Sequence, residues 1–210
     1  MTPYEMLEKV KLDYKENKPQ EFIGFWNGGL TDTEEEGTFS NFQRALFTVD
    51  VGGYFKLRAV KNVKFTSSEQ YFMFLKAYHF NDHEMMEKMV EKGHEPYHYK
   101  MLGRQVKNYK DDEWDKVRYG YMLDALRAKY RQNKDLQKIL LDTGNAILVE
   151  ASPFDKIWGV GLAKSTKNGK ELHDWKNPLK WRGDNLLGFA LMDIREELLE
   201  DNDINYRKYN

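Results

Sequence analysis

Residues 65–80, with the sequence FTSSEQYFMFLKAYHF, decide much of how this chain folds. Between Tyr71 and Tyr78 every residue except Lys76 is apolar or aromatic. A helix that is apolar on all sides is normally buried, because no face of it suits contact with water. The stretch therefore predicts a buried helix over about residues 67–80.

Two charged residues of this helix are candidates for chemistry. Glu69 and Lys76 are seven positions apart, which places them on one helix face, two turns from each other. Burial lowers the pKa of a lysine and makes it nucleophilic, whereas a nearby carboxylate opposes that shift. Structural interpretations compete with this one. Thr66 and Glu69 have the spacing of a capping box, and Lys76 suits either the edge of a core or an ion pair with Glu69.

The remaining pattern predicts an α+β fold, a single mostly helical domain with a small β-sheet. An N-terminal extension covers residues 1–20 and the domain covers residues 21–205. Apolar periodicity and turn residues predict five further helices near 4–17, 83–92, 111–132, 135–141 and 185–200, strands at 22–26 and 146–151, and a hairpin of 45–51 with 54–60 around Gly52-Gly53. We expect loops at 31–37 (acidic), around Pro96, and at 166–180, where a hairpin is also possible. The long helix is expected to be capped by Asp111 or Asp112.

The composition narrows the classes of function. Lys and Arg total 33 and Asp and Glu total 34, so the chain has no overall basic excess that would favour a nucleic acid backbone. There is no cysteine, which rules out disulfides, thiolate nucleophiles and sulfur-ligated zinc. The segment from Met1 to Lys18 lacks the apolar stretch of a secretory signal, and we expect no membrane span. We expect a cytoplasmic protein, in a host cytoplasm if a phage encodes it.

Two segments in the second half of the chain suggest a binding site. Residues 150–161, EASPFDKIWGVG, follow a predicted strand and contain Asp155, Trp158 and the glycines Gly159 and Gly161. Glycine lets a ligand approach the backbone closely, although the same pattern suits a surface turn with a core tryptophan. Residues 181–188, WRGDNLLG, precede the last predicted helix.

Within that second segment two residues stand out. Asn185 suits a helix N-cap, and a helix N-terminus can also hold a phosphate. Gly188 lies inside the helical pattern at a cost of about 1 kcal/mol relative to alanine, which indicates close packing. Weaker signals are Arg104, which suits a phosphate or an ordinary surface position, and the pair His79 and His83. That pair has the spacing of half a zinc site, but the metalloprotease motif is absent, and we predict no metal.

Taken together, these segments resemble the YbiA-like, or NADAR, family over about residues 37–200. The similarity rests on short pieces in a fixed order, which are FSNF at 39–42, SEQYF at 68–72 with Lys76-Ala77, LGR at 102–104, WD at 114–115, RAKY at 127–130, the TG of 143–144, LVE at 148–150, D-x-x-W-G at 155–159 and N-x-L-G at 185–188. Each piece is weak alone, but their order and spacing together are specific.

The resemblance implies hydrolysis of an N-glycosidic bond without a metal or redox cofactor. Members of the family act on phosphoribosylamino-pyrimidine intermediates of riboflavin biosynthesis, and others remove ADP-ribose from guanine in DNA. It implies a catalytic role for Glu69, Lys76, Asp155 and Trp158. It implies substrate binding by Ser40, Asn41, Phe42, Tyr71, Arg104, Gly159, Gly161, Asn185 and Gly188.

Several roles stay open at this point. Glu69 is expected to be the main acid/base and Asp155 to orient water or stabilise positive charge, with Trp158 stacking on the sugar or base. Lys76 is either a Schiff-base nucleophile or a partner of Glu69 or of the phosphate. The alternative function is a non-catalytic ADP-ribose or nucleotide sensor. The extension and the stretches at 31–37 and 162–181 depart from short family members and leave the natural substrate undecided.

Overall fold

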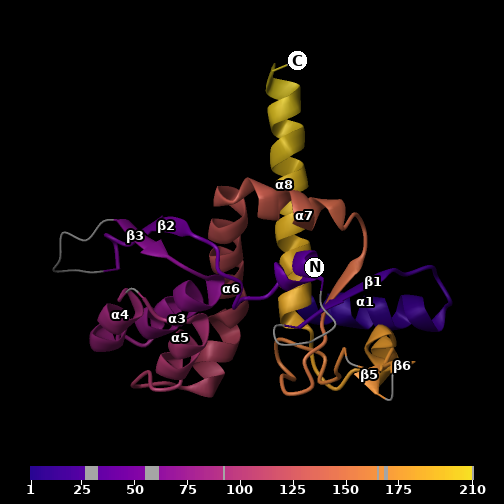
Figure 1. Ribbon diagram of the computed structural model, residues 1–210, viewed down its shortest axis with the longest axis horizontal. Coiled ribbons are helices and arrows are strands. Elements are labelled where there is room, and N and C mark those ends of the chain that lie inside the picture. Colours follow the sequence, from indigo (N-terminus) through magenta and orange to yellow (C-terminus); the bar gives the residue numbers. More distant parts are fainter. Residues whose placement is uncertain (27–32, 55–61, 92, 165, 168–169, 210) are drawn as a thin grey trace. The chain divides into compact units, whose positions relative to one another are not determined.

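The computed structural model describes residues 1–26, 33–54, 62–91, 93–164, 166–167 and 170–209 (Figure 1). The chain divides into two compact units. We call the unit of Asn41–Asp135 the α3 unit. We call the unit of Met1–Ser40 and Leu136–Asn210 the β4 unit.

The α3 unit is built around the buried helix that the sequence predicts. Helix α3 contacts α4, α5 and α6, and Figure 1 shows these helices grouped together. Eight consecutive residues of α3, Ser68–Leu75, are buried, as is Ala77. The elements of this unit are β2 (Phe47–Asp50), β3 (Asn62–Phe65), α3 (Ser68–His79), α4 (His83–Met89), α5 (Pro96–Gly103) and α6 (Asp111–Gln132).

Helix α5 lies where the sequence predicted a loop around Pro96. Proline is tolerated at the first helical position, because its missing N–H has no partner inside the helix there. Pro96 occupies that position and begins the helix instead of breaking it. At the other end, a Cβ on Gly103 would lie 2.0 Å from the sulfur of Met73, so a larger residue there would displace the Met73 side chain from the contact between α5 and α3.

The small sheet of this unit corrects the predicted hairpin. Strand β2 pairs with β3 in antiparallel register, with Asp50 opposite Asn62. A two-residue turn at Gly52-Gly53 would instead pair Asp50 with residue 55, so that part of the prediction is wrong. Most of the predicted second strand, residues 55–60, lies outside the described residues.

The β4 unit centres on a parallel pair of strands covered by the last helix. Strand β1 pairs with β4, with Phe22 opposite Ile147, and α8 packs against β4 while α1 contacts α8. The unit contains α1 (Pro3–Lys15), β1 (Phe22–Phe25), α2 (Glu34–Gly37), most of α7 (Lys134–Asp142), β4 (Ile147–Glu150), β5 (Thr166–Lys167), β6 (Lys170–Glu171), the 3-10 turns η1 (Asp174–Lys176) and η2 (Pro178–Lys180), and α8 (Leu186–Tyr209).

Three local predictions need correction. Part of the acidic segment forms the short helix α2, because Thr33 and Glu36 make a capping box. The carboxylate of Glu36 also accepts from Lys164 at 2.5 Å, which anchors this turn. Helix α6 has Lys110 at its N-cap and no side-chain cap, so neither predicted aspartate serves there. Helix α4 ends at Met89 rather than near residue 92.

The predicted α+β class is confirmed by these elements.

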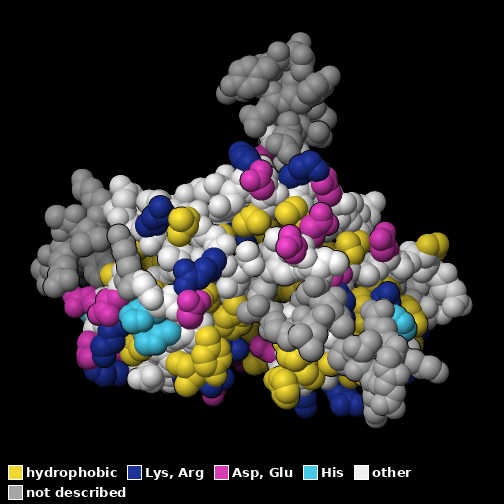
Figure 2. Space-filling view, in the orientation of Figure 1, with side chains coloured by type: hydrophobic (Ala, Val, Ile, Leu, Met, Phe, Trp, Pro, Cys, Tyr) yellow, Lys and Arg dark blue, Asp and Glu magenta, His cyan; other side chains and the backbone are white. Residues whose placement is uncertain are grey.

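The face displayed in Figure 2 carries both acidic and basic side chains. Among the described residues these two kinds of side chain are interspersed on that face. None of the helices in the described parts of the chain combines the length and the apolar character that crossing a bilayer requires.

Candidate active site

The start of α3 holds Glu69 without using it as a cap. Ser67 is the N-cap, and its hydroxyl accepts from the backbone N–H of Gln70. The side chain of Gln70 in turn accepts from the backbone N–H and the hydroxyl of Thr66. The capping interpretation of Thr66 and Glu69 is therefore wrong, because the neighbouring pair Ser67 and Gln70 performs that task.

Asn41 fixes the first turn of this helix. The backbone N–H of Glu69 donates to the carbonyl oxygen of Asn41 at 3.1 Å. The hydroxyl of Ser68 lies 3.2 Å from the side-chain oxygen of Asn41. Glu69 is only 5% exposed and Asn41 only 6% exposed. Two motifs that are distant along the chain thus meet, and they hold a carboxylate in surroundings from which most water is excluded.

Lys76 lies over an aromatic surface on the same helix. Its ammonium nitrogen is 4.0 Å from the ring centroid of Tyr109 and 5.9 Å from that of Trp114. A cation over an aromatic face is attracted by the ring quadrupole. Within the described residues Lys76 has no ion-pair partner, so the interpretation as a direct pair with Glu69 is wrong.

The surroundings shift Lys76 toward its neutral form. Burial lowers the pKa of Lys76, and the positive charge of Arg104 lowers it further. The negative charges of Asp111 and Glu69 act in the opposite direction but do not cancel the effect of burial. A lysine in this state is a better nucleophile at neutral pH than an exposed one, because more of it carries a free amine.

The other predicted residues of the α3 unit lie in different surroundings. Tyr71 is buried in an aromatic cluster, with its ring centroid 4.7 Å from that of Phe65, and burial raises its pKa. Phe42 is half-buried beneath the ammonium of Lys100, 5.3 Å from the ring centroid. Arg104 is exposed at the end of α5. Ser40, the last residue in the first segment of the β4 unit, is buried.

In the β4 unit, Asp155 organises its own loop. One carboxylate oxygen, Oδ1, accepts from the backbone N–H groups of Ile157 and Trp158 at 2.9 and 2.8 Å. This arrangement is an Asx turn, in which an aspartate replaces a backbone acceptor. The carbonyl of Asp155 also accepts from Gly161, whose positive φ of 68° suits glycine. Trp158 is half-buried in this loop.

The backbone carbonyls of the same loop accept hydrogen bonds from the start of α8. The N–H groups of Leu186 and Leu187 donate to the carbonyls of Ile157 and Trp158, and the N–H of Asn185 donates to Gly159. These donors are the ones that a phosphate at a helix N-terminus would use. The hypothesis of a phosphate at this helix end is therefore not supported by the hydrogen bonds.

Asn185 and Gly188 join α8 to β4. The side chain of Asn185 accepts from the backbone N–H of Glu150 and donates to the carbonyl of Leu148, so it bridges to the strand and does not cap its own helix. Its φ of 56° is in the left-handed region, where asparagine is among the better tolerated residues. A Cβ on Gly188 would lie 2.0 Å from the carbonyl oxygen of Leu148. The prediction of close packing at Gly188 is confirmed.

Sequence reasoning missed the aromatic partners of Lys76. Tyr109 donates to Asp111 at 2.8 Å, and burial together with this hydrogen bond raises the pKa of Tyr109 to about 12. Its ring therefore stays a neutral phenol at physiological pH. The sequence pointed to Trp114 through the WD pair at 114–115 of the family resemblance, not as a partner of Lys76. Lys76 and Tyr109 are too far apart along the chain for any local pattern to signal their contact. His79, one of the two histidines considered as half a zinc site, lies against Tyr121 at 3.3 Å.

A family model describing the NADAR domain matches residues 25–199. The chain belongs to the NADAR family. Helix α1 and most of β1 precede the matched range. The NADAR match spans both units, and it contains every residue predicted to act in the site.

The chain is also similar to three known proteins. The mimivirus protein N-glycosidase R617 is 44% identical over 135 residues, which cover 64% of this chain and 75% of R617. Protein irg-1 of Caenorhabditis elegans is 36% identical over 194 residues, covering 90% and 85%. N-glycosidase YbiA of Escherichia coli is 31% identical over 166 residues, covering 79% and 84%. The NMR structure of YbiA matches with a TM-score of 0.62 at 28% identity, covering 88% of this chain and 89% of YbiA.

Proposed function

We propose that this protein is an N-glycosidase that hydrolyses the bond between a phosphorylated ribose, or an ADP-ribose, and an amino-bearing base. Membership of the NADAR family supports the reaction class, because R617 and YbiA are both named N-glycosidases. The substrate is nucleotide-like. Two natural substrates fit this description, a ribosylamino-pyrimidine phosphate and guanine that carries ADP-ribose.

Glu69 is the proposed acid/base. Cleavage moves the electron pair of the C1–N bond onto the leaving nitrogen, which takes a proton from the carboxylic acid of Glu69. C1 develops oxocarbenium character, and water then attacks it while the carboxylate receives a proton from that water. The buried position of Glu69 and its rigid backbone support this role, because a positioned carboxyl group transfers protons without first reorganising a shell of water.

Lys76 supplies the second proposed role. In one route its free amine adds to C1 of the ring-opened substrate, and the base leaves with its amino group as C1 forms an imine with Lys76. Water then hydrolyses the imine, which releases the sugar aldehyde and restores the amine. In the other route Lys76 remains charged and binds the phosphate or stabilises the Glu69 carboxylate. The lowered pKa and the lack of an ion-pair partner in the described residues favour the first route.

We propose that the predicted site residues of the β4 unit contribute mainly by holding the loop around Asp155 in its conformation. Asp155 still has an oxygen, Oδ2, with no hydrogen-bond partner in the described parts of the chain, so a contribution to orienting water stays part of the proposal. Trp158 is proposed to stack on sugar or base. Because Asn185 and Gly188 hold α8 on β4, we propose that they support the loop and do not touch the substrate.

The observation that carries the proposal is the pair on α3, a buried carboxylate and a lysine shifted toward its neutral form on one helix face. The test is a turnover assay of the purified protein with two substrates in parallel. These are 5-amino-6-ribosylaminouracil 5′-phosphate and an oligonucleotide with ADP-ribosylated guanine, and mass spectrometry identifies the products.

Each outcome has a distinct meaning. Release of ribose 5-phosphate from the first substrate or of ADP-ribose from the second supports the N-glycosidase and selects the substrate. Trapping with borohydride during turnover is expected to leave the sugar on Lys76 if the imine route operates. ADP-ribose binding without hydrolysis of either substrate would contradict the proposal and favour a sensor.

A further inference from the structure

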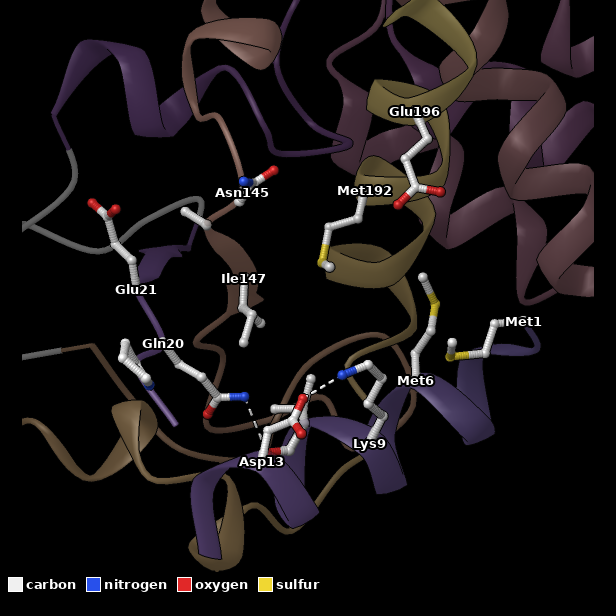
Figure 3. A pocket seen from close by; sticks show the side chains of 13 residues that line it. Met1, Met6, Lys9, Asp13, Gln20, Glu21, Asn145, Ile147, Met192 and Glu196 are labelled. Carbon is white, nitrogen blue, oxygen red and sulfur yellow. Dashed lines mark hydrogen bonds and ion pairs between the residues drawn. The ribbon is translucent and has the colours of Figure 1, made fainter. Parts of the chain in front are cut away.

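Two features of the molecule lie outside the roles assigned so far. One is a pocket of about 700 Å³ in the β4 unit, between α1, β4 and α8, where the carboxylates of Glu21 and Glu196 lie apart and do not converge on one ligand (Figure 3). The other is in the α3 unit and has a definite chemistry. The ring centroid of Tyr109, which has no role in the reaction as described, lies 4.0 Å from the ammonium nitrogen of Lys76.

The segment between α5 and α6 fixes the backbone that carries this ring. Val106 is buried, and the backbone N–H of Lys107 donates to the carboxylate of Asp82 at 2.8 Å. Asn108 has a φ of 59°, in the left-handed region that asparagine tolerates better than most residues, and the chain turns there. The backbone that leads into Tyr109 is therefore held by local contacts.

The ring of Tyr109 is also held by its neighbours. Its hydroxyl donates to Asp111 at 2.8 Å, at the start of α6. The buried ring of Phe80 meets it edge-on, with 5.3 Å between the centroids. Tyr109 is nevertheless 38% exposed, so the ring lies where the surroundings of Lys76 meet solvent. The ring is thus a fixed aromatic surface next to a reactive lysine.

The attraction between the ring and Lys76 depends on the charge of the lysine. The quadrupole of an aromatic face attracts a cation, whereas a neutral amine carries no net charge for it to attract. Other charged or titratable side chains around the two residues come from α3, α5 and α6. They are Glu69 and His79 of α3, Arg104 at the end of α5, and Asp111, Asp115 and Arg118 of α6, of which the last two pair with each other.

We propose that Tyr109 is a positioning residue for Lys76, whose ring holds the ammonium form in place and releases the amine when it loses one proton to solvent. The inference rests on the proposed imine route, in which only the free amine adds to C1. Because the ring stabilises the charged form, it raises the pH at which the amine becomes free and so opposes the effect of burial. Tyr109 thereby sets the pH range in which the nucleophile is available.

The test weakens the attraction of the ring for a cation while changing its size little. Tyr109→Phe is the parent variant, and the same position then receives phenylalanines with one, two and three ring fluorines, which withdraw electron density from the face of the ring. The full-length protein is labelled with ¹³C at lysine Cε, and NMR follows the titration of Lys76, whose signal Lys76→Met identifies. We expect the midpoint to move stepwise to lower pH as fluorines are added.

Tyr97 provides the matched control. It is an exposed tyrosine of α5, and among the described residues its ring does not lie under Lys76. Tyr97→Phe and its fluorinated forms should leave the midpoint of Lys76 unchanged. A midpoint that stays constant across the fluorinated series at position 109, or that moves equally with the series at position 97, would overturn the proposal.

The NMR titration needs no substrate, so it separates this inference from the proposed function. If the imine route operates, the rise of the turnover rate with pH should shift together with the NMR midpoint. A shifting midpoint without turnover of either substrate would support the hold of Tyr109 on Lys76 and contradict the N-glycosidase. Turnover with a constant midpoint would contradict the role of Tyr109 alone.

Discussion

The side chains of the family-motif residues have different hydrogen-bonding roles in the two units. In the α3 unit, Ser67 and Gln70 cap the helix, so the carboxylate of Glu69 is not needed for that purpose. In the β4 unit, the side chains of Asp155 and Asn185 bind backbone groups of the loop and the strand. Residues that belong to equally clear family motifs therefore have two different roles. Those of the α3 unit are proposed to act in the reaction, whereas those of the β4 unit hold the loop and the strand in place.

The difference lies in what each side chain does for the fold. A polar side chain that satisfies buried backbone groups cannot be removed without leaving those groups unpaired. A charged side chain in apolar surroundings contributes little to the stability of the fold, and burying its charge costs free energy. Lys76 is of the second kind, since within the described residues its cation lies against aromatic faces. Residues retained at such a cost are good candidates for function.

Replacing Lys76 should have the largest effect among the tests of this comparison. Lys76→Met removes the amine and should lower kcat by at least about 10²-fold, because both proposed routes need it. Lys76→Arg keeps the charge but cannot form an imine, so its activity separates the two routes. In the imine route the wild-type rate should rise with pH through an inflection below the ordinary lysine pKa of 10.5, because burial lowers the pKa of Lys76. Steady-state rates across pH check this, and a loss in Lys76→Met of less than tenfold would remove Lys76 from the reaction.

Gly188→Ala should destabilise the β4 unit strongly. Its Cβ would lie 2.0 Å from the carbonyl oxygen of Leu148, and backbone at that distance must move. We expect a loss of about 3 kcal/mol in the free energy of unfolding, at the upper end of the range for overpacking. Gly120→Ala, where a Cβ meets no atom within 4 Å, is the matched control and should be neutral or stabilising. Urea unfolding measures both, and equal stabilities would refute the close packing of α8 on β4.

The role of Asp155 can be divided by two substitutions. Asp155→Asn keeps an oxygen that accepts from Ile157 and Trp158, whereas Asp155→Ala leaves both N–H groups without that acceptor. The alanine variant should lose about 1–3 kcal/mol of stability and the asparagine variant much less. If Asp155 is only a loop organiser, the asparagine variant should also keep most of its activity. A stable but inactive Asp155→Asn would instead assign Asp155 to the reaction itself.

The last expected effect appears only when the pH is changed, and it concerns Lys129, which is fully buried in α6. Burial lowers the pKa of Lys129 to about 7, while the unfolded chain keeps an ordinary lysine pKa of 10.5. Between these values the unfolded state binds more protons, so the contribution of Lys129 to stability is present above pH 10.5 and is lost as the pH falls toward 7. The slope should approach roughly 1.4 kcal/mol per pH unit. Lys129→Met should remove this slope in urea unfolding at several pH values, and an unchanged slope would contradict the buried neutral amine.

The sequence predicted the elements that have strong local patterns. Helix α3 follows from its apolar run, and α6 follows from the spacing of Trp114, Ala125 and Leu126. Prediction failed where the local pattern is ambiguous. Pro96 suits either a helix start or a break, and β3 is only four residues long with alternating burial. The burial of Lys129 also has no local signal, since lysine normally lies on the polar face of a helix.

The candidate site was predictable as a set of residues but not as a set of roles. The resemblance identified Glu69 and Lys76 together with Asp155 and Asn185. Only the hydrogen bonds show that Asp155 and Asn185 bind backbone groups, whereas Glu69 is not used as the cap of its helix. A motif alone does not indicate whether a side chain faces a ligand or the backbone. The contact of Lys76 with Tyr109 depends on how α3 packs within its unit, which no spacing along the chain encodes.

The central claim is that the buried carboxylate on α3 transfers the proton to the leaving base. Single-turnover cleavage by the wild type and by Glu69→Gln, each with bound substrate measured in parallel, tests it most directly. We predict that Glu69→Gln binds substrate with little change and cleaves it about 10²–10⁴-fold more slowly. Cleavage by Glu69→Gln within tenfold of the wild-type rate would contradict the account.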